Sequence, residues 1–188
     1  MKSEKDFIND LLNEKNKNKA FKKLLNLYQK RLYWYIRKLV VTHENSNDVL
    51  QNTFLRVYKS LPKFKQQSSL NTWMFKIAYN ESIRFLNNEK KKQNESLDNI
   101  SSTYLKKLAS DPFFEADEVQ LKLQQILAKI PENHRHIFQM KYFDDLKFKE
   151  MAVILGIKEG TLKTSYYATV KHIKKNMENV ELFSKIEV

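Results

Sequence analysis

The chain has 188 residues, contains no cysteine, and carries a formal net charge of +12 from 34 Lys and Arg against 22 Asp and Glu. The missing cysteines exclude disulfides, thiolate nucleophiles and cysteine-containing zinc sites. No apolar run approaches the roughly 20 residues of a membrane span, and the amino terminus lacks a signal peptide's apolar core, so we predict a cytoplasmic protein with no direct membrane insertion.

The positive charge is concentrated in two blocks. Residues 20–92 hold 15 Lys and Arg against 4 Asp and Glu, and residues 117–176 hold 11 against 7. The segment 93–116 between them holds 2 against 4. This distribution predicts two modules that face nucleic acid and are joined by a linker, although an acidic membrane surface or solubility alone would also suit the charge.

The first half of the chain is predicted to form three helices. Two glycines and three prolines leave long uninterrupted segments for helix, which predicts an all-α fold. The helices are expected over 20–41, from a cap at Asn45 or Ser46 to Pro62, and over 70–88. Their apolar positions are, in order, Phe21, Leu24, Leu25, Tyr28, Leu32, Tyr35, Ile36 and Leu39; Val49, Leu50, Thr53, Phe54, Val57 and Leu61; and Leu70, Met74, Ile77, Ala78 and Phe85.

A second row of side chains lies beside the apolar stripe of the third helix: Trp73, Lys76, Asn80, Arg84 and Asn87. An indole followed by amide and cationic groups suits unpaired bases, because π faces stack on bases and amides recognise their edges. The preceding loop adds the cationic Lys63 and Lys65. The alternative is that Trp73 belongs to the core and the polar row is only solvated.

The second half is predicted to be a linker followed by four helices. Residues 93–116 mix Asn, Ser, Asp and Pro with scattered apolar groups, which is typical of a linker with one short helical turn. The domain expected at 117–176 begins with a helix that stops at Pro131, and residues 177–188 are expected to form a tail. The apolar positions of that helix are Val119, Leu123, Ile126, Leu127 and Ile130.

The last two helices are predicted to form a helix-turn-helix. In the first of them, Phe148, Met151, Ala152 and Leu155 share a face, and Gly156 allows the sharp turn into the second. The apolar face of the second helix is Leu162, Tyr166, Thr169, Val170 and Ile173, and its polar face is Thr161, Thr164, Ala168, Lys171, His172 and Lys175. Small and hydroxyl side chains followed by lysines suit a helix in a DNA groove. An ordinary helical hairpin is the alternative.

No residue pattern indicates an enzyme. His134 and His136 point to different faces of a helix, while His43 and His172 stand alone, so all four are expected at the surface or in caps. The two glycines cannot build a phosphate-binding loop. We therefore expect no catalytic residue, no metal site, no cofactor and no small-molecule substrate.

Two segments of the first domain resemble region 2 of the bacterial extracytoplasmic-function sigma factors, a group of the sigma-70 family: NDVLQNTFLRVY at 47–58 and LNTWMFKIAYN at 70–80. Four segments of the second domain are similar to region 4 of the same group: IPE at 130–132, MKYF at 140–143, FKEMA at 148–152 and LGIKEGTLKT at 155–164. The resemblance covers roughly residues 20–92 and 117–176. Two motif sets in this order are more specific than either alone.

The resemblance implies a promoter-specificity subunit of RNA polymerase with two small helical domains, at 1–92 and 117–176. Its implied partners are core RNA polymerase, promoter DNA and an anti-sigma factor. The implied polymerase-binding residues, which would grip the coiled coil of the largest subunit, are Asp48, Gln51, Phe54, Leu55 and Tyr58. The implied minus-ten residues are Lys63, Lys65, Trp73, Lys76, Asn80 and Arg84, and the minus-thirty-five residues are Thr161, Lys163, Thr164, Ala168, Lys171 and Lys175.

Two rival functions follow from the residues alone. A free-standing helix-turn-helix regulator would explain the charge and the last two helices, but it leaves the 47–58 helix and the Trp73 row without a role and usually needs a dimer. A nucleic-acid enzyme is disfavoured because the sequence offers no cluster of metal ligands.

Overall fold

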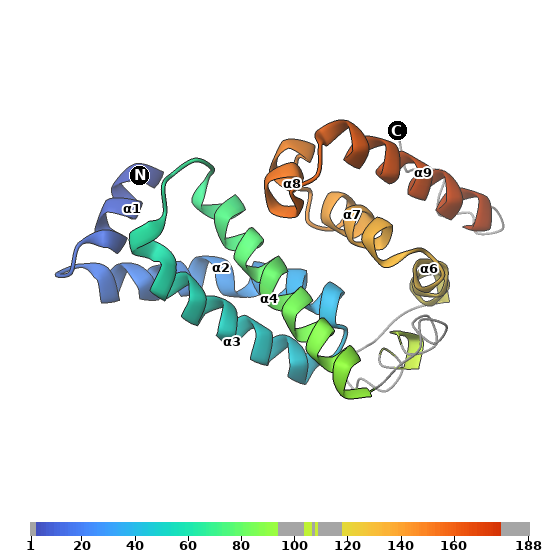
Figure 1. Ribbon diagram of the computed structural model, residues 1–188, viewed down its shortest axis with the longest axis horizontal. Helices are drawn as coiled ribbons and strands as arrows, with labels where there is room; N and C mark the ends of the chain where they lie inside the picture. Colours follow the sequence, from blue (N-terminus) through green and yellow to red (C-terminus); the bar gives the residue numbers. More distant parts are fainter. Residues whose placement is uncertain (1–2, 94–103, 107, 109–117, 178–188) are drawn as a thin grey trace. The chain divides into compact units, whose positions relative to one another are not determined.

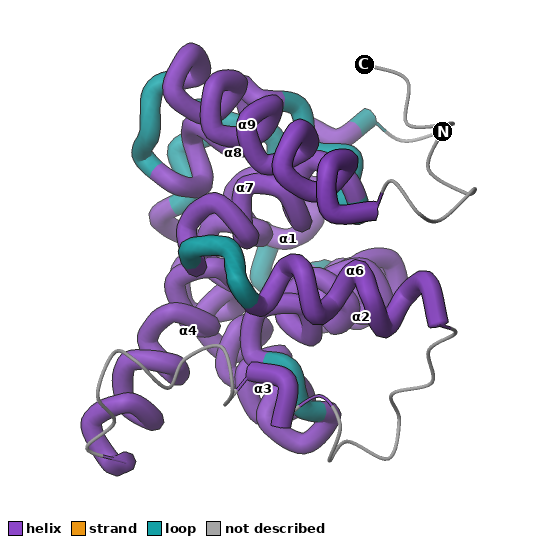
Figure 2. The backbone as a smooth tube through the Cα atoms, turned by 90° about the vertical axis from the view of Figure 1, so that its right-hand side faces the viewer, coloured by secondary structure: helices purple, strands orange, loops and turns teal. Residues whose placement is uncertain are grey.

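The computed structural model describes residues 3–93, 104–106, 108 and 118–177, and it divides into two compact units, residues 1–93 and 94–188. Within the described ranges every regular element is a helix, as the purple segments of Figure 2 show. The all-α prediction is confirmed. No helix in these ranges combines the length and apolarity that a membrane crossing requires.

The first unit is built around three mutually packed helices, α2 (Lys17–Val40), α3 (His43–Ser60) and α4 (Leu70–Gln93) (Figure 1). The three predicted helices are confirmed. A short 3-10 helix, η1 (Leu61–Lys63), follows α3. The sequence periodicity did not predict α1 (Glu4–Leu12), which packs on α2 and contacts η1.

The predicted stripe of α3 is confirmed, but its expected start is wrong. All six apolar positions of the stripe are buried. The helix begins at His43, and the residue before it is Thr42 rather than Asn45 or Ser46. The Ser46 hydroxyl lies one turn inside the helix, where it donates to the Thr42 carbonyl at 2.5 Å, a bond that serine commonly makes within helices.

The predicted core face of α4 is partly wrong. Leu70, Met74 and Ala78 are fully buried, but Ile77 and Phe85 are only half-buried. The fully buried aromatic side chain is Phe75, whose ring centroid lies 4.7 Å from that of Tyr35 on α2. Because α4 packs against both α2 and α3, its buried face is wider than the single stripe assumed from the sequence.

The second unit contains the four predicted helices, α6 (Glu118–Ala128), α7 (Glu132–Tyr142), α8 (Phe148–Leu155) and α9 (Glu159–Met177). α9 packs against α6, α7 and α8. A core cluster of this unit, with residues from α6, α7 and α9, is formed by Leu123, Ile126, Leu127, Ile130, Phe138, Val170, Ile173 and Met177. The predicted apolar face of α9 is confirmed, with only Tyr166 left half-buried.

The turn between α8 and α9 depends on Gly156. Its φ is 69° and its ψ is 24°, which is the left-handed conformation that glycine adopts most easily at helix ends. Its backbone N–H donates to the Ala152 carbonyl at 2.9 Å. At the other end of α8, the Glu150 carboxylate accepts from the Lys147 backbone N–H at 2.9 Å, while the lysine ammonium of Lys147 cannot accept a hydrogen bond as a serine or threonine cap would.

Part of the expected linker packs on the second unit. Residues 104–106 and 108 are helical, and the Tyr104 hydroxyl donates to Gln124 Oε1 at 2.7 Å. The guanidinium of Arg135 lies 4.5 Å from the centroid of the Tyr104 ring. Burial lowers the pKa of Arg135 from its ordinary value. The rest of 93–116, apart from residue 93, and the tail after 177 lie outside the described residues.

One histidine prediction is wrong. His136 is 2% exposed and belongs to the interior of the second unit, because α7 is covered on more than one side. His43 is half-buried, and its ring nitrogens lie 2.7 Å from the Tyr33 hydroxyl and 3.0 Å from Asn47 Nδ2. His134 and His172 are exposed, as expected.

Candidate protein and nucleic-acid interfaces

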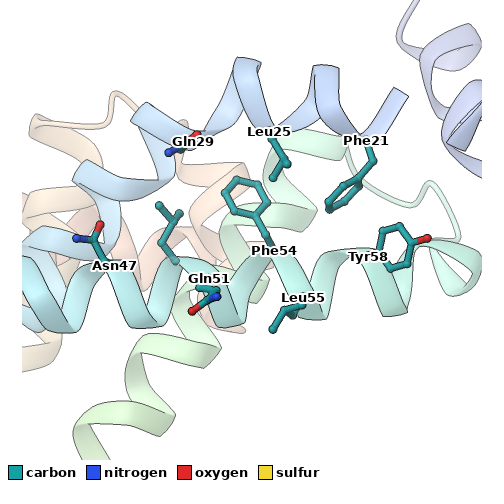
Figure 3. Close-up of a pocket in the computed structure, with 9 residues that line it drawn as sticks. Phe21, Leu25, Gln29, Asn47, Gln51, Phe54, Leu55 and Tyr58 are labelled. Atoms are coloured by element: carbon teal, nitrogen blue, oxygen red, sulfur yellow. The ribbon is translucent and has the colours of Figure 1, made fainter. Parts of the chain in front are cut away.

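An apolar groove of about 420 Å³ runs between α2 and α3 (Figure 3). Leu55 is 53% exposed and Tyr58 is 36% exposed at its rim, whereas Phe54 is 8% exposed and forms part of its floor. The lining residues are Phe21, Leu25, Gln29, Asn47, Leu50, Gln51, Phe54, Leu55 and Tyr58. Four of the five expected polymerase-binding residues therefore line one groove, and the fifth, Asp48, is exposed on the same helix.

The groove is braced at its Tyr58 end. The rings of Phe21 and Tyr58 meet edge to face with centroids 4.9 Å apart, and Lys17 Nζ lies 4.4 Å from the Tyr58 centroid. An apolar floor with amide and cationic groups around it is the usual surface for an amphipathic helix of a partner protein. Phe21 and Leu25, the apolar α2 residues of this surface, are core positions in the prediction from the sequence, because helical spacing is the same in either environment.

A row of polar side chains on α4 faces solvent, as predicted. Lys76, Asn80 and Arg84 are exposed, and so are Lys63 and Lys65 before the helix. Trp73 is half-buried, and its ring centroid lies 4.7 Å from that of the buried Phe64. Trp73 thus combines both sequence interpretations, since one side of the indole packs on the core while part of the side chain remains accessible.

A buried carboxylate forms ion pairs with one arginine of this row and with a second arginine on α3. Glu81 on α4 is 7% exposed and pairs with Arg84 on the same helix and with Arg56 on α3, whose Nε lies 3.4 Å from Glu81 Oε1. Nothing in the local sequence marks Glu81 as the partner of an arginine on α3. The pairing fixes the guanidinium of Arg84 and reduces the net positive charge that Arg84 presents to DNA.

All six predicted groove-facing residues of α9 are exposed: Thr161, Lys163, Thr164, Ala168, Lys171 and Lys175. Lys163 Nζ lies 2.8 Å from Glu159 Oε1, and this hydrogen bond raises the pKa of Lys163. The Thr164 hydroxyl donates to the Gly160 carbonyl at 3.1 Å, which leaves its oxygen as an acceptor for a base amino group. Lys171 and Lys175 extend the cationic edge along the helix.

A small hollow of about 200 Å³ lies next to Ala168. Its lining includes the basic side chains of Lys129, His134 and His172. A methyl group beside three basic side chains suits close approach of a DNA backbone, because the small side chain leaves room and the basic groups can donate to phosphate. Sequence spacing could not bring these three residues together, since they come from different elements.

The second unit also has an aromatic surface that was not predicted from the sequence. Tyr142, Phe143 and Tyr167 are 40%, 43% and 48% exposed. The half-buried rings of Phe148 and Tyr166 lie against this surface, with centroids 5.7 Å apart. Burial is the main cause that raises the pKa of Tyr166. The sequence signal was the presence of two pairs of adjacent aromatic residues, Tyr142–Phe143 and Tyr166–Tyr167. Adjacent side chains on a helix point in different directions, so a single core cannot fully bury both members of a pair.

The two units match two family models. Residues 24–92 match sigma-70 region 2, and residues 120–173 match sigma-70 region 4. The chain is 25% identical over 177 residues to the ECF RNA polymerase sigma factor SigW of Bacillus subtilis, covering 89% of this chain and 94% of that protein. This chain belongs to the extracytoplasmic-function group of sigma-70 factors.

A further relative and two solved structures are also similar to this chain. RNA polymerase sigma factor YlaC of Bacillus subtilis is 28% identical over 153 residues, covering 80% of this chain and 87% of YlaC. The fold is similar to that of RpoE from Bartonella quintana, solved with the anti-sigma factor NepR, with a TM-score of 0.67, 20% identity, and 87% and 99% of the two chains covered. CnrH, solved with the cytosolic domain of CnrY, gives a TM-score of 0.62 at 16% identity, with 87% and 91% covered.

The matched segments of this sigma factor contain nearly all of the candidate surfaces. Region 2 spans the row on α4 and all of the groove except Phe21, and region 4 spans the hollow and all of the α9 face except Lys175. Within the described ranges no three His, Asp or Glu side chains gather as metal ligands would.

Proposed function

We propose that this sigma factor binds core RNA polymerase through the α2–α3 groove, opens and recognises the minus-ten element with α4, and recognises the minus-thirty-five element with α9. The observation that carries the proposal is the groove itself, because Leu55 is an exposed leucine beside an apolar floor and needs a partner to cover it. DNA does not suit such a floor, whereas the faces of α4 and α9 are cationic. RNA polymerase would perform the reaction.

Gel filtration with core RNA polymerase tests this proposal against a free-standing regulator. Comigration with the polymerase, followed by transcription from a promoter that requires this chain, supports the sigma function. A dimer that binds duplex DNA and ignores polymerase would contradict it. The solved complex of RpoE contains the anti-sigma factor NepR, which supports a further proposal that a separate anti-sigma factor controls this sigma factor.

Base recognition in the minus-ten element is expected to depend on Asn80. Asn80→Ala should lose about 1–3 kcal/mol of discrimination, because an exposed amide can recognise a base edge through two hydrogen bonds. Lys76→Ala is the matched control on the same face, and it should weaken all sequences alike. Competition binding of holoenzyme to promoter variants, with permanganate footprinting of the melted bases, measures both effects. Normal melting and normal base preference in Asn80→Ala would contradict this assignment.

Binding of α9 to DNA is expected to depend strongly on salt. The predicted base contacts come from threonines, and the cations of its exposed face are lysines, which bind phosphates as point charges. Lys171→Ala should lower the slope of log affinity against log salt by about 0.9, the value for one phosphate contact. Lys163→Ala should lower it less, because Lys163 already pairs with Glu159. Titrations of a minus-thirty-five duplex and a scrambled duplex at several salt concentrations test this. Strong discrimination with a flat salt response would contradict it.

A further inference from the structure

The amino-terminal end of α4 is held by side chains from two other helices. The Leu70 backbone N–H donates to Glu4 Oε1 of α1 at 2.7 Å, across 66 positions of sequence. Arg31 of α2 donates from Nη1 to Asn71 Oδ1 at 3.3 Å. A local cap adds to these two contacts, where the Thr72 N–H donates to Ser69 Oγ at 3.1 Å.

α1 contacts the chain on both sides of the loop 64–69. Its buried Ile8 and Leu11 anchor it in the first unit, where it packs on α2 and contacts η1. Its Glu4 carboxylate then binds the first residue after the loop. Figure 1 shows α1 beside the segment that connects η1 with α4. The short helix α1 therefore holds the loop at its entry and at its exit.

The Glu4 contact has a clear physical effect on α4. The first N–H groups of a helix have no partner within the helix, and they carry the positive end of its dipole. A carboxylate placed there accepts a charge-assisted hydrogen bond, so it stabilises the first turn of α4 in one position. Trp73 lies in that first turn, and its ring packs against Phe64 at the start of the loop. Loss of the Glu4 contact should therefore loosen Trp73 and the loop together.

We propose that Glu4 is a positioning residue for recognition and opening of the minus-ten element. Glu4 does not contact DNA. It fixes the first turn of α4 and the loop before it, so that Trp73 and the neighbouring polar groups are already ordered when they meet the bases. This inference rests on the proposed role of α4. It gives α1, which lies before the matched region 2 segment, a function in promoter opening.

Three variants in reconstituted holoenzyme test the inference. Glu4→Ala removes the acceptor, and Glu4→Gln keeps an acceptor oxygen without the charge. Glu14→Ala is the charge-matched control, because the Glu14 side chain is 88% exposed and pairs only loosely with Lys17, at 3.9 Å. The measurements are hydrogen exchange of the Leu70 amide, melting of the minus-ten bases by permanganate footprinting, affinity for core polymerase, and the thermal unfolding midpoint.

In Glu4→Ala the Leu70 amide should exchange about tenfold faster, because a charge-assisted hydrogen bond is lost. Promoter melting should fall several-fold with polymerase affinity unchanged, Glu4→Gln should recover much of the loss, and Glu14→Ala should resemble the parent. Unchanged melting in Glu4→Ala would overturn the inference, and so would an equal loss in Glu14→Ala. If Asn80→Ala also melts normally, the proposed role of α4 fails; if Asn80→Ala is impaired while Glu4→Ala is not, only the role of Glu4 fails.

Discussion

Leu55→Asp is expected to weaken binding to core RNA polymerase by more than a hundredfold, a loss of about 3 kcal/mol, while the protein stays folded. Leu55 is 53% exposed in the free protein, so the aspartate costs little there. In the complex, a partner helix seated in the groove would bury that carboxylate next to Phe54 and Tyr58 without a counterion, which is costly.

Leu27→Asp is the matched control for this experiment. Leu27 lies on α2 and is 58% exposed, but it does not line the groove. Both variants add one negative charge at an exposed leucine of the same unit, so any general effect of charge appears in both. Fluorescence titration of labelled sigma factor with core polymerase gives the two affinities. If both variants lose affinity equally, or if Leu55→Asp loses none, the groove is not the polymerase-binding surface.

Phe138→Ala is expected to destabilise the second unit by about 3–5 kcal/mol, which is a large part of the stability of a small domain. Phe138 is 1% exposed and belongs to the core formed by α6, α7 and α9. Its ring also stacks on Tyr142, with centroids 5.1 Å apart and an angle of 12° between the planes. Removing it leaves a cavity that the packed helices can fill only partly.

Hydrogen exchange followed by mass spectrometry distinguishes the two units in this variant. Peptides from α6 to α9 should lose protection, while peptides from α2 to α4 should keep it, because the two units have separate cores. Tyr142→Ala is the control, since it removes the exposed partner of the same ring pair and should cost only about 1 kcal/mol. Loss of protection in α2 to α4 as well would show that the units unfold together.

Local pattern was sufficient for most of the helices. Burial in a helix repeats every three or four residues, so the stripe of α3 and the apolar face of α9 could be predicted from spacing alone. Gly156 marked the turn between α8 and α9, because few other residues adopt its φ. The exposed residues expected on α4 and α9 follow from the same periodicity, since the side opposite a core face lies in solvent.

Contacts between distant residues could not be predicted in this way. Spacing assigned Leu25 to the core, and only the packing of α2 beside α3 shows that it lines a groove. Glu4 and Glu81 each bind a residue of another helix, Leu70 and Arg56 respectively, and no local rule predicts these two contacts. α1 itself was not predicted from the sequence, because a helix of nine residues has too few turns for a clear apolar stripe.

The left-handed backbone at Gly156 also determines which substitutions this position tolerates. A β-carbon built there meets no atom of a residue beyond its two chain neighbours within 4 Å, so size is not what restricts the site. The restriction is conformational and amounts to about 1 kcal/mol for most residues, less for asparagine and aspartate, and most for β-branched side chains. Tolerance at position 156 should therefore follow left-handed propensity instead of side-chain volume, and an asparagine can replace the glycine while the angle between α8 and α9 is kept.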